Sequence, residues 1–413
     1  MDLKILVLAV FIIIYLYGLL LNIIRMRSAD NRIPDNVSDV YDLPTYRKWR
    51  AYHAEKSRFA IVTSTVTFLV ELALLAFNAY AAFAGLFPKQ DPVLQMFAVL
   101  LLSALSSLVL LPFSWHETMV IEEKYGFNKS TAGTFWADRI KEFVIQMILM
   151  VAVGGILMAV HHALGDWLVP AFAVLMTLLI LGITFLYPVF SKIFNKFTPL
   201  EDGELKDKLT GLLEKNGYRV RGIRVMDASR RTTKSNAYFT GFGKMKTIVL
   251  FDTLVESMTA DEICAVFAHE MGHGLHKDTL KRQILTFVQM IVLGILAWLT
   301  LRTVELFLPF GFSGINYGFA IILIMGVEFP LVAPLFGLLV NRFSRRAEYR
   351  ADAQAVREGY GVELVSALKK LSKQNLSDLS PSPLLVKLEY SHPPLSQRIS
   401  AIEKASDREE GTC

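Results

Sequence analysis

The chain has 413 residues, of which 53% are hydrophobic and only two are cysteines, and its mean hydropathy is +0.41. This composition excludes a disulfide framework and an ordinary soluble enzyme, and it indicates an integral membrane protein. In a membrane protein, a net charge of +5 indicates topology in the lipid bilayer more than it indicates nucleic-acid binding. We do not expect nucleic acid as a partner.

The N-terminal segment is apolar from Ile5 to Ile24, which is longer than a signal-peptide core, and no small-residue cleavage site follows it. We therefore interpret it as an uncleaved transmembrane helix. Further segments along the chain are also long and apolar enough to span a bilayer. We place the seven predicted spans near residues 4–24, 60–86, 94–115, 143–163, 167–190, 284–308 and 316–340.

Lysine and arginine are distributed unevenly between these spans. The basic segments are residues 25–58, 116–142, 191–283 and the tail after residue 340. By contrast, the segment 87–93 contains only one basic residue, Lys89. Because basic loops stay in the cytoplasm, we expect the N-terminus outside and the C-terminus inside. The compact length favours a bacterial inner membrane, with the endoplasmic reticulum membrane as the alternative.

The long segment 191–283 contains three short stretches whose composition predicts β-strands. They are Arg221–Met226, Ser235–Thr240 and Thr247–Phe251. Gly241, Phe242 and Gly243 predict the turn between the last two. We therefore expect a small sheet that leads directly into the next helix.

That helix carries the pattern H-E-x-x-H, as H-E-M-G-H at 269–273. His269 and His273 are four positions apart, so both imidazoles can reach one metal ion, and Glu270 can take a proton from water. Thr259 and Glu262 form a predicted capping box, which places the start of the helix before His269. The alternative is a helix with two incidental histidines.

A catalytic zinc ion needs three protein ligands and one open position. His276 shares the helical face of His269 and His273 but lies one turn further along, too far to bind the same ion. We therefore expect it at the surface or beside a ligand. The better candidate is Glu348, in segment 341–352, which we expect to be a helix emerging from the seventh span. Asp352 shares its face, so one carboxylate can bind metal while the other holds a histidine. The alternative is an exposed, salt-bridged helix.

Together these motifs resemble the type I CAAX prenyl proteases, which are integral-membrane zinc endopeptidases. The resemblance rests first on H-E-M-G-H at 269–273 and S-R-R-A-E-Y-R-A-D at 344–352. Further matching stretches are E-K-Y-G-F-N-K-S-T at 123–131, N-K-F-T-P-L at 195–200, S-N-A-Y-F at 235–239 and H-P-P-x-x-x-R-I at 392–399. It covers nearly the whole chain, and the number of predicted spans agrees.

The resemblance implies roles that the residues alone do not show. Glu348 would be the third ligand of one Zn²⁺ per chain, and Asp352 would support the ligands. His392 would help to stabilise the tetrahedral intermediate, with Arg398 in support. The catalytic residues would then be Glu270 and His392.

The resemblance also implies a substrate. Asn236 and Ala237 would lie on an edge strand that pairs with the backbone of a peptide or protein presented at the membrane. The peptide would end in a prenylated cysteine followed by three residues, and those three would be released. The sequence itself does not show that prenylation is required.

Two alternatives remain open. One is a membrane metalloprotease of protein quality control, a related group with the same zinc motifs, in which we would not expect E-K-Y-G-F-N-K-S-T. The other is a non-catalytic membrane scaffold or transporter with a vestigial metal site. The intact Glu270 argues against the second, because a purely structural zinc site has no use for a base.

We therefore predict an all-α integral membrane protein with seven transmembrane helices and a zinc-peptidase unit containing a small β-sheet. Residues 1–200 would form an N-terminal membrane region with five spans, and 201–283 a cytoplasmic segment with the sheet and the H-E-x-x-H helix. Residues 284–340 would contain spans six and seven, and 341–413 would complete the zinc site.

Overall fold

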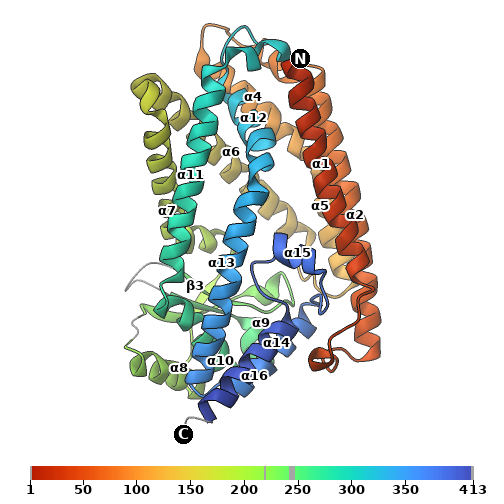
Figure 1. The fold of residues 1–413 in the computed structure, drawn as a ribbon, viewed down its shortest axis with the longest axis vertical. Coiled ribbons are helices and arrows are strands. Elements are labelled where there is room, and N and C mark those ends of the chain that lie inside the picture. The colour runs from red at the N-terminus through yellow and green to blue at the C-terminus, as the bar shows by residue number, and fades with distance from the viewer. Residues whose placement is uncertain (1, 218–219, 241–246, 411–413) are drawn as a thin grey trace.

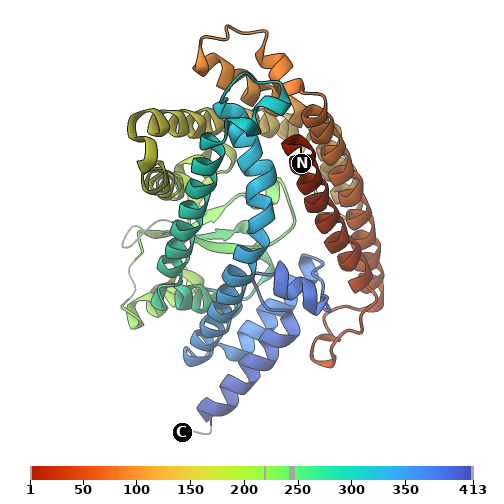
Figure 2. The same cartoon turned by 45° about the horizontal axis from the view of Figure 1, so that its top comes forward.

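The structure is a computed structural model that describes residues 2–217, 220–240 and 247–410. Long helices form one part of the molecule, and a cap of shorter helices with a small sheet lies at one end of them (Figure 1). The first helix begins at the end of the molecule farthest from the cap, and the C-terminus lies at the tip of the cap. The helices α1 and α2 run side by side in both views (Figures 1 and 2).

Long helices account for most of the chain. In order, they are α1 (Leu3–Ser28), α2 (Leu43–Ala76), α4 (Pro92–Ser107), α6 (Ala132–Leu164), α7 (Leu168–Phe194), α11 (Asp278–Arg302) and α13 (Phe329–Arg357). Shorter helices extend three of them: α3 (Ala79–Ala84) follows α2, α5 (Leu111–His116) follows α4, and α12 (Tyr317–Leu323) precedes α13. A π-helical turn at Ile324–Glu328 joins α12 to α13.

Polar side chains fix where several of these helices begin. Asp42, Asp91 and Thr131 each accept a backbone N–H from the first turn, at the starts of α2, α4 and α6. Asn78 adopts a left-handed conformation with φ of 58°, which separates α2 from α3. The second predicted span, 60–86, was therefore wrong as one continuous helix.

Six described helices are long and apolar enough to cross a membrane. They cover Leu3–Ser28, Leu43–Ala76, Pro92–Glu122, Ala132–Leu164, Leu280–Arg302 and Tyr317–Arg357. The predicted fifth span falls on α7, whose described apolar stretch, Val169–Ile183, is shorter. A multi-pass helical protein is thus confirmed, whereas the number of seven spans is not.

The cap contains a four-stranded mixed sheet of order β1-β2-β4-β3. Its strands are β1 (Phe197–Pro199), β2 (Gly222–Met226), β3 (Ala237–Thr240) and β4 (Thr247–Phe251). β4 pairs parallel with β2 and antiparallel with β3, so β1 and β3 are the two edges. The three predicted strands are present, β1 was not predicted, and the predicted turn at Gly241–Gly243 lies outside the described residues.

Short helices complete the cap. They are α8 (Glu204–Lys215), α9 (Asp252–Ser257), α10 (Ala260–Leu275), α14 (Gly361–Gln374), α15 (Pro383–Leu388) and α16 (Leu395–Glu410). The core of the cap includes Phe267, Leu209 and Leu364, together with Val37 and Trp49 from the N-terminal part of the chain. The cap is therefore built by segments from both ends of the sequence.

Candidate metal centre

Helix α10 begins at the predicted capping box. The Thr259 side chain accepts the backbone N–H of Glu262, and the Glu262 carboxylate accepts the backbone N–H of Thr259. Glu262 also accepts hydrogen bonds from Ser366 and Lys370 on α14. The start of α10 is thus fixed both locally and by a neighbouring helix.

Gly272 lies where α13 crosses closest to α10. A Cβ atom at this position would lie 2.9 Å from the Cα of Ala351 and 3.0 Å from the Cβ of Gln354. Any larger residue would therefore have to push the two helices apart. The glycine within H-E-M-G-H allows the separation of α10 and α13 that the site needs.

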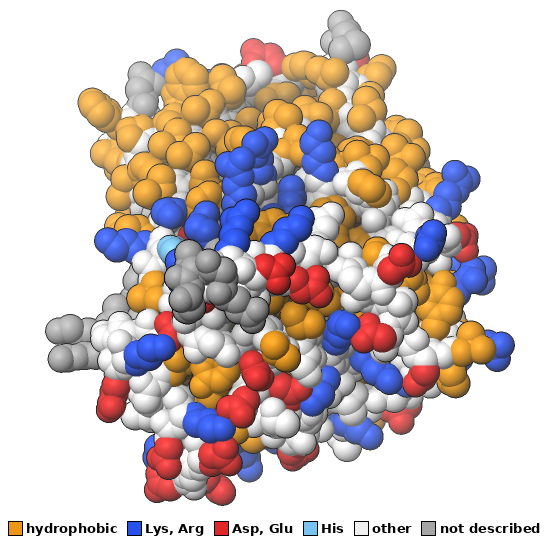
Figure 3. All heavy atoms as spheres, turned by 60° about the horizontal axis from the view of Figure 1, so that its bottom comes forward, with side chains coloured by type: hydrophobic (Ala, Val, Ile, Leu, Met, Phe, Trp, Pro, Cys, Tyr) orange, Lys and Arg blue, Asp and Glu red, His pale blue; other side chains and the backbone are white. Residues whose placement is uncertain are grey.

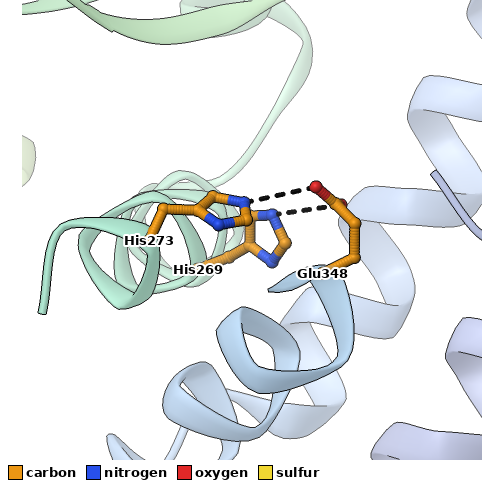
Figure 4. A group of neighbouring side chains, drawn as sticks. All are labelled: His269, His273 and Glu348. Carbon is orange, nitrogen blue, oxygen red and sulfur yellow. Dashed lines mark ion pairs between the residues drawn. The ribbon is translucent and has the colours of Figure 1, made fainter. Parts of the chain in front are cut away.

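This close packing brings side chains from the two helices to one point (Figure 4). His269 and His273 extend from α10 toward Glu348 on α13. Nε2 of His273 lies 3.3 Å from Oε1 of Glu348, and Nε2 of His269 lies 3.6 Å from Oε2. One ligand atom from each of the three residues lies within 4.8 Å of the other two.

The three side chains fit a tetrahedral metal ion. Two imidazole nitrogens and a carboxylate oxygen are typical zinc ligands, each bound at about 2.0–2.2 Å, so neighbouring ligand atoms should be about 3.4 Å apart. The separations of 3.3 and 3.6 Å, each to a different oxygen of Glu348, are close to that value. His269, His273 and Glu348 are therefore positioned to hold one ion.

The second nitrogen of His269 is held from the side away from Glu348. Nδ1 lies 2.8 Å from Oδ1 of Asp352, which is buried with 1% of its side chain exposed. Arg398 on α16 donates to both oxygens of Asp352, at 2.6 and 3.0 Å. Burial disfavours the Arg398 cation, but the Asp352 carboxylate outweighs it and raises the arginine pKa. The pair leaves Nε2 of His269 free to bind metal.

His273 has an equivalent support that the sequence did not predict. Its Nδ1 lies 3.2 Å from Oδ2 of Asp278, the first residue of α11, and Arg350 on α13 donates to Oδ1 of Asp278 at 2.6 Å. Burial opposes ionisation of Asp278, but hydrogen bonds from Arg350 and His273 outweigh it and lower the pKa of the carboxyl group. The only sequence signal was an acid five residues after a candidate ligand.

The remaining predicted catalytic residues lie beside this cluster. Nδ1 of His392 is 2.8 Å from Oε2 of Glu348, although 64% of the His392 side chain is exposed. Nη1 of Arg398 lies 3.5 Å from the same oxygen. Glu270 is half-buried on α10, close enough for its charge to act on both His273 and Arg398. The structure thus brings these residues together with the candidate ligands.

The predicted substrate strand is an edge of the sheet. Phe251 donates its backbone N–H to the carbonyl oxygen of Asn236, and Ala237 is opposite Leu250 in the antiparallel pair. Since successive residues of a strand face alternate edges, the N–H of Ala237 points away from β4. It is bonded to the side-chain oxygen of exposed Asn236, at 2.9 Å.

His276, considered above as a ligand, and Cys264 both lie outside the cluster. His276 ends α10 as its C-cap and is half-buried. Cys264 is fully buried in the core of the cap, and burial raises the pKa of its thiol to about 11. Cys264 is therefore a small residue of the core.

Two family models together cover almost the whole chain. The N-terminal region of CAAX prenyl proteases, described as five membrane helices, matches residues 22–196. Peptidase family M48 matches residues 199–406, which include all the candidate ligands. The boundary between the two lies just after α7.

Similar proteins and a similar structure are known. A CAAX prenyl protease 1 homolog of Arabidopsis thaliana is 34% identical over 388 residues, covering 90% of each chain. CAAX prenyl protease 1 of Saccharomyces cerevisiae is 32% identical, covering 92% of this chain and 90% of that one. The crystal structure of S. mikatae Ste24p matches with a TM-score of 0.89 at 31% identity, covering 98% of this chain and 99% of that chain.

Proposed function

We propose that this chain is a zinc enzyme whose substrate is a prenylated C-terminal tail. The chain belongs to peptidase family M48, has the N-terminal region of the CAAX prenyl proteases, and is a multi-pass membrane metallopeptidase. The observation that carries the proposal is the convergence of His269, His273 and Glu348 on one point beside Glu270. The curated relatives, named for CAAX prenyl protease activity, support the choice of substrate.

The ligands of the proposed zinc ion are His269, His273 and Glu348. When bound, zinc supplies Lewis acidity toward the scissile carbonyl and a water molecule. Asp352 orients His269, and Arg398 keeps Asp352 ionised.

Proton transfer is the proposed role of Glu270. Its carboxylate accepts a proton from the attacking water and then passes it to the leaving amine. His392 and Arg398 both lie next to Oε2 of Glu348. From there they can donate hydrogen bonds to the oxyanion of the tetrahedral intermediate. His392 is the more exposed of the two, so it can move from Glu348 to the substrate.

The edge strand β3 is the proposed substrate-binding element. Its outward N–H at Ala237 can pair with a peptide carbonyl if the Asn236 side chain moves aside. Ala237→Pro would delete that donor without touching a ligand, so we expect a large loss of cleavage with metal content unchanged. Cleavage close to wild type in the folded variant would remove Asn236 and Ala237 from the site.

We propose α7 as the seventh membrane span. The first helix begins at one end of the molecule and the C-terminus lies at the other, which supports an odd number of crossings (Figure 1). The basic segments and the metal centre then face the cytoplasm. The eukaryotic origin of the named relatives supports the endoplasmic reticulum membrane over the bacterial inner membrane that we expected from the sequence.

Mass spectrometry of products from two matched peptides tests the substrate. The peptides share a sequence that ends in cysteine and three further residues, and only one is prenylated. We expect the tripeptide to be released from the prenylated peptide. In the control variant Glu270→Gln, we expect turnover to fall by roughly a hundredfold or more while bound zinc stays near one equivalent.

The outcomes separate the alternatives. Equal cleavage of both peptides would refute the prenyl requirement and favour a quality-control protease. Cleavage of neither peptide by zinc-loaded protein would refute the proposed substrate class. If the purified, active protein contained a different metal, the proposal of zinc would be wrong.

A further inference from the structure

Helices α11 and α13 form one continuous outer surface near the metal centre. They pack against each other, and α11 starts beside the C-terminal half of α13, because Arg350 donates to Asp278 at 2.6 Å. The two helices run in opposite directions (Figure 1). Residues shortly after Asp278 therefore lie at the same level as residues shortly before Arg350.

The exposed face of α11 changes character at this level. Lys281, Ile284 and Val288 are spaced three and four positions apart, so they share one helical face, and Lys277 is the residue just before the helix. Ile284 and Val288 are exposed, at 58% and 44%, as expected for side chains in contact with lipid. The face is thus apolar in the membrane and cationic at its cytoplasmic end.

The exposed face of α13 shows the same change. Leu331, Leu335 and Leu339 follow at intervals of four, and Arg342 and Arg346 continue the same face. Leu335 and Leu339 are each 64% exposed, and both arginines are exposed. Two neighbouring helices therefore pass from apolar to cationic side chains at one level.

The cations here far outnumber the acids. In the stretches 277–302 and 329–347, the sequence contains Asp278 as its only acidic residue. Asp278 is buried and bonds to Arg350 and His273, with Lys281 3.8 Å away. Within the described part of the chain, we find no ion-pair partner for Arg282, Arg342 or Arg346. Figure 3 shows Lys and Arg side chains gathered where the apolar surface ends.

We propose that this α11–α13 surface binds an anionic phospholipid, with the phosphate held by Lys277, Lys281, Arg282, Arg342 and Arg346. The acyl chains would lie on the apolar rows of the same two faces. Only an amphiphilic ligand satisfies both halves of the surface, because a soluble anion would leave the leucine rows unused. A topology signal alone requires basic loops, but not cations that continue the lipid-facing rows of two adjacent helices.

The test compares lipids bound to the full-length protein in nanodiscs or detergent. We would measure retention of phosphatidylglycerol and of zwitterionic phosphatidylcholine by native mass spectrometry. The test variant is Arg342→Gln/Arg346→Gln. The matched control, Arg230→Gln/Lys404→Gln, removes the same charge from exposed positions outside the spans. Zinc content and the melting temperature report whether each variant is folded.

We expect the wild type and the control to retain phosphatidylglycerol in preference to phosphatidylcholine. The test variant should retain on the order of tenfold less phosphatidylglycerol, with zinc content unchanged. Equal retention in the test and control variants would overturn the proposal. Equal affinity of the wild type for both lipids would do the same. Displacement of the lipid by millimolar glycerol phosphate would assign the surface to a soluble phosphate instead.

Discussion

The two histidines of the candidate metal centre lie on one helix but are supported from different parts of the chain. His269 is held by Asp352 on α13, 83 positions away in sequence, at 2.8 Å. His273 is held by Asp278, five positions away, at 3.2 Å. Both carboxylates are almost completely buried, with 1% of each exposed.

Each carboxylate is in turn bonded to one arginine. Arg398 donates two hydrogen bonds to Asp352, whereas Arg350 donates one to Asp278. The same chain of histidine, aspartate and arginine is therefore built twice, more tightly on the His269 side. The comparison indicates that the helix specifies which atoms can bind metal, while tertiary contacts specify how firmly each imidazole is oriented.

The largest effect is expected when either histidine is removed. We expect His269→Ala and His273→Ala each to lose most of the bound metal and at least a hundredfold in peptide cleavage, since two ligands do not form a complete site. Elemental analysis of the purified variants measures the metal directly. Full metal occupancy in either variant would show that the imidazole concerned is not a ligand.

A smaller effect is expected from Asp352→Asn, which keeps the size of the side chain but removes its charge. Both His269 and Arg398 lose their carboxylate partner, so we expect metal affinity to fall by about ten- to a hundredfold. Competition with a chelator of known affinity gives the value. Unchanged affinity would mean that His269 needs no support from α13.

Asp278→Asn tests the other side, and we expect a smaller loss than for Asp352→Asn, roughly tenfold in metal affinity. The hydrogen bond to His273 is longer, and Arg350 contributes one bond in place of two. The same chelator competition ranks the two variants. A loss greater than that of Asp352→Asn would reverse the proposed order of the two supports.

The smallest effect is expected from His276→Ala. This histidine is the C-cap of α10, the helix that carries both candidate histidine ligands, and it lies outside the cluster. We expect metal content and peptide cleavage to stay within about twofold of wild type, because no ligand or support is removed. A clear loss of metal would add His276 to the site.

The sequence predicted those parts of the molecule that depend on local chemistry. The start of α10 follows from the capping box of Thr259 and Glu262, which forms within one helical turn. The strand Thr247–Phe251 was predicted to the residue, because a short apolar run rich in β-branched residues is typical of a buried strand. The family resemblance was confirmed over residues 22–196 and 199–406.

Other features depended on contacts that a local pattern does not contain. Asp278 meets His273 because Lys277 takes a left-handed conformation, with φ of 54°, between α10 and α11. Such a turn is uncommon for a lysine, so no local pattern predicted it. β1 was missed because it is only three residues long and ends in Pro199 at the edge of the sheet.

The helices also differ from their predicted spans for a physical reason. Hydropathy detects only the part of a helix that lies in lipid, whereas α2 begins at Leu43, well before its apolar part. The close approach at Gly272 was likewise unpredictable, because it depends on where α13 crosses α10.

The order of the site residues along the chain has a consequence for biosynthesis. His269 and His273 leave the ribosome before α11 and α13, whereas Glu348 lies in the C-terminal half of α13, and His392 and Arg398 follow that helix. The ligand set is therefore incomplete until both of those membrane helices have been synthesised. A nascent chain exposes the H-E-x-x-H helix first. Without the third candidate ligand the site is incomplete, so we do not expect it to cleave neighbouring proteins during translation. The connectivity of the fold therefore delays assembly of the candidate site until the last membrane helix has been synthesised.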